Sequence, residues 1–234
     1  MIVFEKQNHP EEYEKLMVWE YFGFSQDGFF IDIGANDPKI LSQTWLLERM
    51  GWRGILIEPL AEKKEALIHE RPHSKVYQVA VSSPDKVGEA DFFVSDMMSS
   101  LQKNINDNSV TYQTTTRVKV VTLDSILEEL QPPHIDFVSM DTEGTELDVF
   151  KGFDIKKWKP SLLLVEDIVL SLDVHKHLTR NGYILYRRTG LNSWYIPGSS
   201  ARRPTLIDRI KLFRKYYLGT TWRRYKHNRK AKTA

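Results

Sequence analysis

A nine-residue stretch, Phe29 to Asp37, constrains the fold of this chain more than any other part of it. It is an apolar run that ends in the small, flexible pair Gly34-Ala35, and a helical pattern follows from Ser42. Phenylalanine and isoleucine favour strands, while glycine permits a sharp turn and the close approach of a ligand. The stretch therefore predicts the first strand, turn and helix of a nucleotide-binding α/β domain.

A second apolar strand, predicted over residues 54–57, carries an acid at its carboxyl end. Glu58 lies 58 − 34 = 24 residues after Gly34, close to the spacing of about 20 residues at which an acid binds the ribose hydroxyls of an adenosine. A carboxylate at this place accepts two hydrogen bonds from a vicinal diol. The glycine turn alone fits an ordinary strand-to-helix turn equally well, but the turn together with Glu58 favours adenosine binding.

The remaining hydrophobic patterns extend the same alternation of strands and helices. They predict strands over 75–81, 90–94, 117–121, 135–141, 161–165, 182–187 and 192–196, and helices over 10–21, 61–71, 122–130 and 174–180, with a further helix opening after Gly144. The polar segment 95–116 is long for a loop. It is interpreted either as a lid or substrate-binding segment or as an insertion without function.

Length and composition fit one domain with small appendages. The chain has 234 residues, of which 41% are hydrophobic, enough for a substantial core. We expect an N-terminal helical cover over 1–28, a ligand-binding domain over 29–200 and a basic tail over 201–234. Because there is no cysteine, disulfides, thiolate zinc sites and cysteine nucleophiles are excluded. The first nine residues lack the pattern of a signal peptide, so we expect a cytoplasmic protein.

The tail is strongly basic. Residues 202–234 contain 12 Lys and Arg and one acid, giving 12 − 1 = +11, whereas the rest of the chain has 21 basic and 30 acidic residues, giving 21 − 30 = −9. Residues 206–217 predict a basic amphipathic helix, and Trp222 and Tyr225 add aromatic side chains beyond it. The pattern favours docking on the anionic cytoplasmic face of a membrane, with an anionic glycan, nucleic acid or plain packing as the alternatives.

Several predicted strands end in acids, which a parallel sheet brings to one rim. These residues are Asp32, Glu58, Asp141, Glu166 and Asp167. The chain lacks the third glycine of a dinucleotide-binding turn and has no phosphate-binding loop. An acidic pocket suits a ligand with sulfonium, amine and hydroxyl groups better than a pyrophosphate, and S-adenosylmethionine is such a ligand.

Four blocks of the sequence resemble the FkbM-type S-adenosylmethionine-dependent methyltransferases. They are residues 30–37 with 41–44, residues 51–59, residues 121–124, and residues 135–146, the last being the most specific to that family. The resemblance implies the class I methyltransferase fold, which is an α/β, Rossmann-like, seven-stranded and mostly parallel sheet with helices on both faces. It also implies O-methylation, often of sugar or polyketide hydroxyls.

The resemblance also implies the residues that bind the cofactor. Asp32, Gly34, Ala35 and Asn36 would contact the methionine part, Glu58 with Pro59 the ribose, and the segment around Ala80 and Val81 the adenine. Ser42 and Thr44 match a Ser-Asn-Thr stretch of the family, from which Gln43 departs. Asp141 is included in the cofactor site as well.

Methyl transfer to a hydroxyl needs a group that takes up the hydroxyl proton. Asp141, Glu143 and Glu166 are the candidate catalytic residues. A divalent ion such as Mg²⁺ is the alternative, held by Asp141, Glu166 and Asp167. Glu143 and Glu146 also fit acids that merely stabilise a helix N-terminus.

The sequence thus favours an O-methyltransferase acting on a sugar, a nucleotide sugar or a lipid-linked glycan. The alternative from another class is a non-catalytic binding or scaffold protein that keeps this fold and uses its tail to hold nucleic acid or a membrane. Methylation of nucleic acid is disfavoured, because the sequence Gln-Pro-Pro-His at 131–134 precedes a predicted strand, whereas a catalytic Asn-Pro-Pro-Tyr motif would end one.

Overall fold

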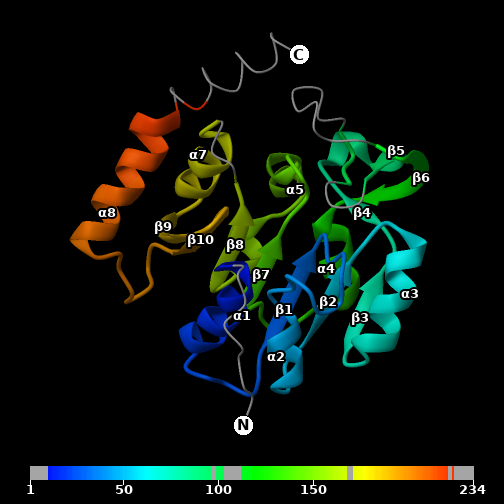
Figure 1. Cartoon of the computed structure of the whole chain (residues 1–234), viewed down its shortest axis with the longest axis horizontal. Helices are drawn as coiled ribbons and strands as arrows, with labels where there is room; N and C mark the ends of the chain where they lie inside the picture. The colour runs from blue at the N-terminus through cyan, green and yellow to red at the C-terminus, as the bar shows by residue number, and fades with distance from the viewer. Residues whose placement is uncertain (1–9, 96–98, 103–111, 168–170, 221–222, 224–234) are drawn as a thin grey trace.

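A seven-stranded sheet forms the centre of the computed structural model (Figure 1), which describes residues 10–95, 99–102, 112–167, 171–220 and 223. The strand order is β3-β2-β1-β7-β8-β10-β9, and every neighbouring pair is parallel except the two pairs that β10 makes. The strands are β1 (Phe29–Ile33), β2 (Arg53–Ile57), β3 (Ser74–Tyr77), β7 (Phe137–Met140), β8 (Leu162–Glu166), β9 (Tyr183–Thr189) and β10 (Asn192–Pro197). The predicted fold class is confirmed.

Helices cover both faces of this sheet because successive strand residues point to opposite sides. Phe30, Leu56 and Leu164 point to one face, where they pack against side chains from α1 (Pro10–Tyr21), α2 (Trp45–Arg49) and α3 (Ala61–Glu70). Ile31, Ile57 and Val165 point to the other face and pack against α4 (Leu123–Leu130), α5 (Glu146–Lys151), α6 (Ile155–Trp158) and α7 (Asp173–Arg180). The result is a three-layer molecule with one apolar core on each side of the sheet.

The prediction of a single strand over 75–81 was wrong. The chain leaves the large sheet after β3, and β4 (Ala80–Val81) joins β5 (Gly88–Val94) and β6 (Thr114–Val121) in a separate three-stranded sheet. β4 pairs with β6, and β6 pairs with β5, so long-range pairing overrides the single strand that the pattern of 75–81 predicts. A 3-10 turn, η1 (Pro84–Lys86), connects β4 to β5.

The order of the strands reverses between β1 and β7, and Gly34 allows the ends of these two strands to lie close together. Gly34 follows β1 with φ +81°, and a Cβ atom there would overlap the carbonyl oxygen of Asp141, which follows β7. Glycine is therefore required both by the backbone angle and by the close approach of the two strand ends. Ligands of open α/β sheets bind at such a switch point.

The last described helix lies outside the layers. α8 (Leu206–Phe213) continues into a π-helix, η2 (Arg214–Leu218), and runs beside β9 at the edge of the large sheet (Figure 1). This agrees with the helix predicted over 206–217, whereas Trp222 and Tyr225 of the predicted tail lie outside the described residues. Across the described part of the chain, no helix has the length and apolar character needed to cross a bilayer.

Candidate functional site

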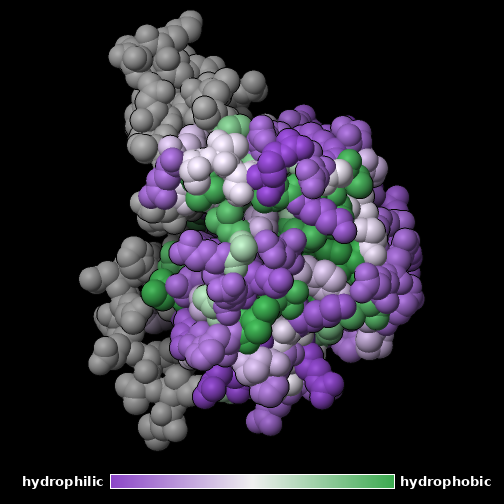
Figure 2. Space-filling view, turned by 90° about the vertical axis from the view of Figure 1, so that its right-hand side faces the viewer, coloured by the Kyte–Doolittle hydropathy of each residue, from purple (hydrophilic) through white to green (hydrophobic). Residues whose placement is uncertain are grey.

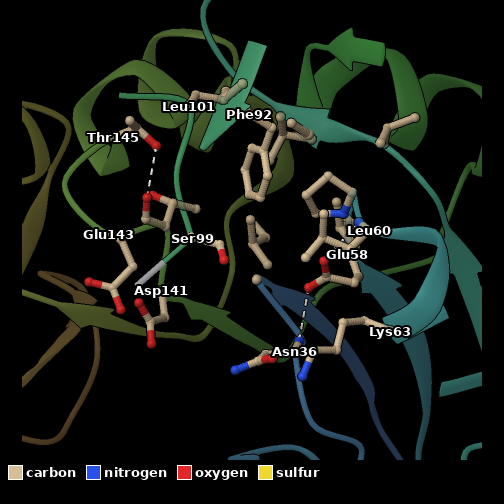
Figure 3. Close-up of a pocket in the computed structure, with 18 of the residues that line it drawn as sticks. Asn36, Glu58, Leu60, Lys63, Phe92, Ser99, Leu101, Asp141, Glu143 and Thr145 are labelled. Carbon is tan, nitrogen blue, oxygen red and sulfur yellow. Dashed lines mark hydrogen bonds between the residues drawn. The ribbon is translucent and has the colours of Figure 1, made fainter. Parts of the chain in front are cut away.

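A hollow opens at the carboxyl ends of β1, β2 and β7, beside the small sheet. The space in and around it measures about 710 Å³, which includes open solvent at its mouth. Figure 3 shows Glu58 and Asn36 at one end of the hollow and Asp141 and Glu143 at the other. The two ends therefore present carboxylates across one shared space.

The Glu58 carboxylate is buried and held by the backbone. Its Oε2 accepts a hydrogen bond from the Asn36 N–H at 3.1 Å, and its Oε1 accepts one from the Leu60 N–H at 2.9 Å. Burial raises the pKa of Glu58, and these two N–H groups partly offset that rise. Each carboxylate oxygen keeps a second lone pair, so this fixed group can still accept the two hydroxyls of a ribose.

Apolar side chains enclose the part of the hollow next to Glu58. They come from the loop after β2, from the small sheet and from the segment after β5, and they are Pro59, Leu60, Val79, Ala80, Val81, Phe92 and Leu101. The Phe92 ring extends into the space between the two ends (Figure 3). A flat heteroaromatic ring such as adenine fits an apolar enclosure of this kind.

Three acids meet at the opposite end. Oxygen atoms of Asp141, Glu143 and Glu166 all lie within 4.8 Å of one another. The Asp141 carboxylate is open to the hollow while protein surrounds its other sides, and the loss of hydration together with the charge of Glu166 raises its pKa well above the usual value. Burial and the charges of Asp141 and Glu146 raise the pKa of Glu143 to about 8. Burial and the neighbouring negative charges thus favour the protonated forms of these carboxyl groups.

Glu146 has a structural role beside these acids. Its Oε1 accepts hydrogen bonds from the N–H and hydroxyl of Thr142, at 3.2 and 3.1 Å, and from the Gly144 N–H at 3.0 Å. These bonds fix the loop on which Glu143 sits with φ 54°. The prediction that such an acid stabilises the start of a helix thus describes Glu146, whereas Glu143 lines the hollow.

Four of the predicted cofactor residues do not line the hollow. Asp32, Ala35, Ser42 and Thr44 are buried behind its wall. Asp32 accepts a 2.6 Å hydrogen bond from the Thr44 hydroxyl, and Arg71 donates to Thr44 and Ser42 and pairs with Glu48 at 2.6 Å. Asp32 shares the face of β1 that points towards α2, so its side chain holds the loop after β1 through Thr44 and does not enter the hollow.

The group of acids that lie close together differs in one residue from the predicted metal-binding group. Asp167 does not join Asp141 and Glu166, because its carboxylate accepts a 3.3 Å hydrogen bond from the Tyr216 hydroxyl and its carbonyl accepts one from Arg188. Consecutive residues of an extended chain point in opposite directions, which separates Asp167 from Glu166. Glu143 takes its place in the only group of three close acids among the described residues.

Of the remaining predicted residues, Gly34, Asn36, Glu58, Pro59, Val81, Asp141 and Glu143 line the hollow, and Glu166 joins the acids. Their roles in binding and catalysis stay predictions. The sequence did not identify Leu60, Lys63, Phe92, Ser99 and Leu101, which also line it. Phe92 alternates with Ala90 and Val94 in an apolar pattern, and this was the one available signal for its inward position.

The described residues of segment 95–116 include part of the wall. Ser95, Ser99 and Leu101 line the hollow, and the Ser100 hydroxyl lies 3.2 Å from the carbonyl oxygens of both Thr142 and Glu143. The segment therefore contacts the acid-bearing loop, as a substrate-binding segment would. Residues 96–98 and 103–111 lie outside the described residues.

Comparison with known proteins gives a family match. Residues 32–185 match the family described as the methyltransferase FkbM domain. No protein with curated function matches the chain at a significant level.

Methyltransferases are among the solved structures with a similar fold. A precorrin-6y C5,15-methyltransferase from Geobacter metallireducens has 8% sequence identity, with 83% of this chain and 92% of that chain covered and a TM-score of 0.45. A methyltransferase from Geobacter sulfurreducens has 11% identity, coverages of 84% and 80%, and a TM-score of 0.44. A human methyltransferase 10 domain containing protein has 12% identity, coverages of 82% and 83%, and a TM-score of 0.42. Similarity at this level supports no inference about substrate.

Proposed function

The chain belongs to the FkbM methyltransferase family, and on that basis we propose that it is an S-adenosylmethionine-dependent O-methyltransferase acting on a hydroxyl of a sugar or glycan. Membership of the family implies S-adenosylmethionine as the methyl donor. The observation that carries the proposal is the group of acids at Asp141, Glu143 and Glu166, which faces Glu58 across the hollow.

The residues around the hollow fit the donor in three ways. Glu58 is fixed so that it can accept a vicinal diol, and the apolar enclosure beside it fits adenine. The missing Cβ of Gly34 lets the ends of β1 and β7 come close together, which brings Asp141 to the same rim as Asn36 and Glu58. Burial and mutual repulsion raise the pKa values of the acids at the far end. A positively charged group close to them lowers these pKa values, and the ionised carboxylates then attract it. When bound, the donor supplies an electrophilic methyl group on a positively charged sulfur.

The acids also suit the acceptor. A hydroxyl oxygen forms a bond to the methyl carbon while the carbon–sulfur bond breaks, and the hydroxyl proton passes to a carboxylate. Glu143, whose pKa is about 8, is matched to take up this proton near neutral pH. Asp141 and Glu166 can accept hydrogen bonds from neighbouring hydroxyls of a sugar and so orient it. The products are a methyl ether and S-adenosylhomocysteine.

The same three carboxylates form an oxygen-donor group of the kind that Mg²⁺ accepts. We therefore include a bound Mg²⁺ as the alternative way to activate the hydroxyl. A chelator distinguishes the two mechanisms. Activity that survives the chelator indicates that a carboxylate takes up the hydroxyl proton, whereas activity that is lost and then restored by Mg²⁺ indicates that the metal activates the hydroxyl.

The test is methyl transfer from labelled S-adenosylmethionine to a panel of nucleotide sugars and lipid-linked glycans. We expect transfer to at least one sugar acceptor, and Glu143→Gln should lower the rate by about 10²-fold or more. Glu65→Gln, an exposed residue of α3, is the matched control and should keep full activity. Donor binding without transfer to any sugar would redirect the search to other acceptors, and absence of donor binding would favour the scaffold alternative.

A further inference from the structure

The outer surface of α8 and η2 is apolar although it faces solvent. Its side chains are Leu206, Ile207, Ile210, Phe213, Tyr217 and Leu218, with exposed fractions of 71%, 64%, 53%, 54%, 49% and 63%. They make up half of the twelve strongly exposed large hydrophobic residues in the described part of the chain. We call this set the outer stripe. Leu206, Ile210, Phe213 and Tyr217 follow the helical spacing of four, three and four residues.

The helix uses a different stripe to attach to the protein. Asp208, Leu212, Tyr216 and Thr220 recur every four residues, and each of them is buried or half-buried. Tyr216 is fully buried and bonded to Ser193. A helix that packs on a soluble domain normally turns its polar face to water. The Tyr217 hydroxyl is hydrogen-bonded to His175 at 3.1 Å, so this one member of the outer stripe also contacts the domain. Packing on the domain does not explain the other five exposed apolar side chains.

Basic side chains border the outer stripe. Arg209, Lys211 and Arg214 are exposed on the same helix, and its single acid, Asp208, is half-buried and bonded to Thr205. The described part of the tail, residues 202–220 and 223, holds seven basic residues and one acid, giving 7 − 1 = +6. An apolar stripe flanked by positive charge is complementary to an anionic lipid surface.

The opposite side of the molecule has a different surface. Figure 2 shows the side with α3 and the small sheet, which is mostly hydrophilic with separate hydrophobic patches. α8 lies at the other edge of the large sheet, beside β9 (Figure 1). Half of the strongly exposed large hydrophobic residues in the described part of the chain thus lie on this one edge, which suits a surface that lies flat on a membrane.

We propose that α8 and η2 dock the protein on an anionic membrane surface, with the outer stripe inserted among the lipid headgroups and the basic side chains contacting their negative charges. A nucleic acid would bind through its phosphate charges, and exposing five apolar side chains to it would add no affinity. The inference is independent of the methyl acceptor, because the outer stripe is separate from the hollow.

Co-sedimentation of the full chain with vesicles tests the proposal. We expect binding to vesicles of phosphatidylcholine with phosphatidylglycerol and little binding to phosphatidylcholine alone. Ile210→Glu should lower the partition coefficient by at least about tenfold, because one isoleucine leaves the apolar layer and a negative charge enters. The matched control is Ile68→Glu on α3, whose exposed fraction of 52% equals that of Ile210 within one per cent and which should bind as the unchanged protein does.

Two further measurements exclude other occupants of the outer stripe. Equal losses from Ile210→Glu and Ile68→Glu, or no binding to anionic vesicles at all, would overturn the proposal. So would a dimer in sedimentation velocity that Ile210→Glu dissociates, or stronger binding to an RNA duplex than to vesicles. Unchanged melting temperatures of both variants would show that the fold is intact.

Discussion

Gly34 and Gly182 adopt similar left-handed backbone angles, with φ +81° and +88°, but only at Gly34 would an added Cβ atom meet another segment. An alanine at either position incurs the conformational cost of a positive φ, about 1 kcal/mol. At Gly34 its Cβ would also overlap the Asp141 carbonyl oxygen, whereas nothing lies within 4 Å at Gly182. We predict that Gly34→Ala lowers the free energy of unfolding by at least about 2 kcal/mol more than Gly182→Ala does, as measured by urea denaturation. Equal losses would show that the strand ends can separate freely.

Asp32 supports the site from behind. We predict that Asp32→Ala lowers the free energy of unfolding by about 1–3 kcal/mol, because the buried hydroxyl of Thr44 loses its acceptor. Donor affinity should fall with it, since the loop after β1 loses its support. Asp91→Ala, which removes only an exposed ion pair with Arg117, should change stability by less than about 0.5 kcal/mol. A loss of affinity with unchanged stability would instead make Asp32 a direct contact.

The raised pKa of Glu143 predicts how stability depends on pH. Its usual pKa of 4.5 becomes about 8 in the folded chain, so between these values the folded state holds a proton that the unfolded state has released. The stabilising contribution is complete below pH 4.5 and is lost as pH rises towards 8. Glu143→Gln removes this loss and should stabilise the protein by about 1–2 kcal/mol more at pH 8.5 than at pH 5, after allowance for partial solvent screening. Thermal melts at both pH values measure the difference; a difference that does not depend on pH would refute the shift.

Much of the candidate site could be predicted at the level of residues. Acids and a glycine at strand ends indicate one rim, and Gly34, Glu58 and Asp141 do line the hollow. Asp32 was placed there because strand alternation was not applied to its side chain. Phe92 and Leu101 were missed because only the folding of the small sheet against the large one brings them to the hollow, and local sequence carries no information about that contact.

At the scale of elements, Tyr216 connects the last helix to the sheet. Its hydroxyl bonds to Ser193 of β10 and lies 3.3 Å from the Asp167 carboxylate beyond β8. We predict that Tyr216→Phe leaves global stability nearly unchanged but weakens the attachment of α8 by about 1–2 kcal/mol. Hydrogen exchange should then speed up by about tenfold in α8 and remain unchanged in α3. Faster exchange in both helices would mean that the hydroxyl stabilises the whole domain.

Helices and strands with a clear hydrophobic period were predictable, and α1, α7, α8 and the β9-β10 hairpin occur close to where the pattern placed them. The exception is the split of 75–81 into β3 and β4. Both halves contain side chains that favour strands, so the division depends on which partner strand each half pairs with. Pairing partners are a property of the tertiary fold, which explains why the local pattern could not predict them.

At the scale of the whole molecule, two surfaces lie at different edges of one three-layer domain. The hollow opens where the strand order reverses between β1 and β7, and α8 lies beyond the opposite edge from β3. The fold itself follows from strands that pack on helices at both faces. The domain boundaries near residues 28 and 200 stay predictions.

The central claim is that the hollow holds the methyl donor with its positively charged sulfur towards Asp141 and Glu143. Isothermal titration calorimetry with S-adenosylmethionine and with S-adenosylhomocysteine, at pH 6 and pH 8, tests it most directly. Because a cation favours the ionised form of Glu143, we predict that the affinity for S-adenosylmethionine rises on the order of tenfold between these pH values. The affinity for S-adenosylhomocysteine, whose sulfur is neutral, should change much less. No binding of either ligand, or the same pH dependence for both, would contradict the claim.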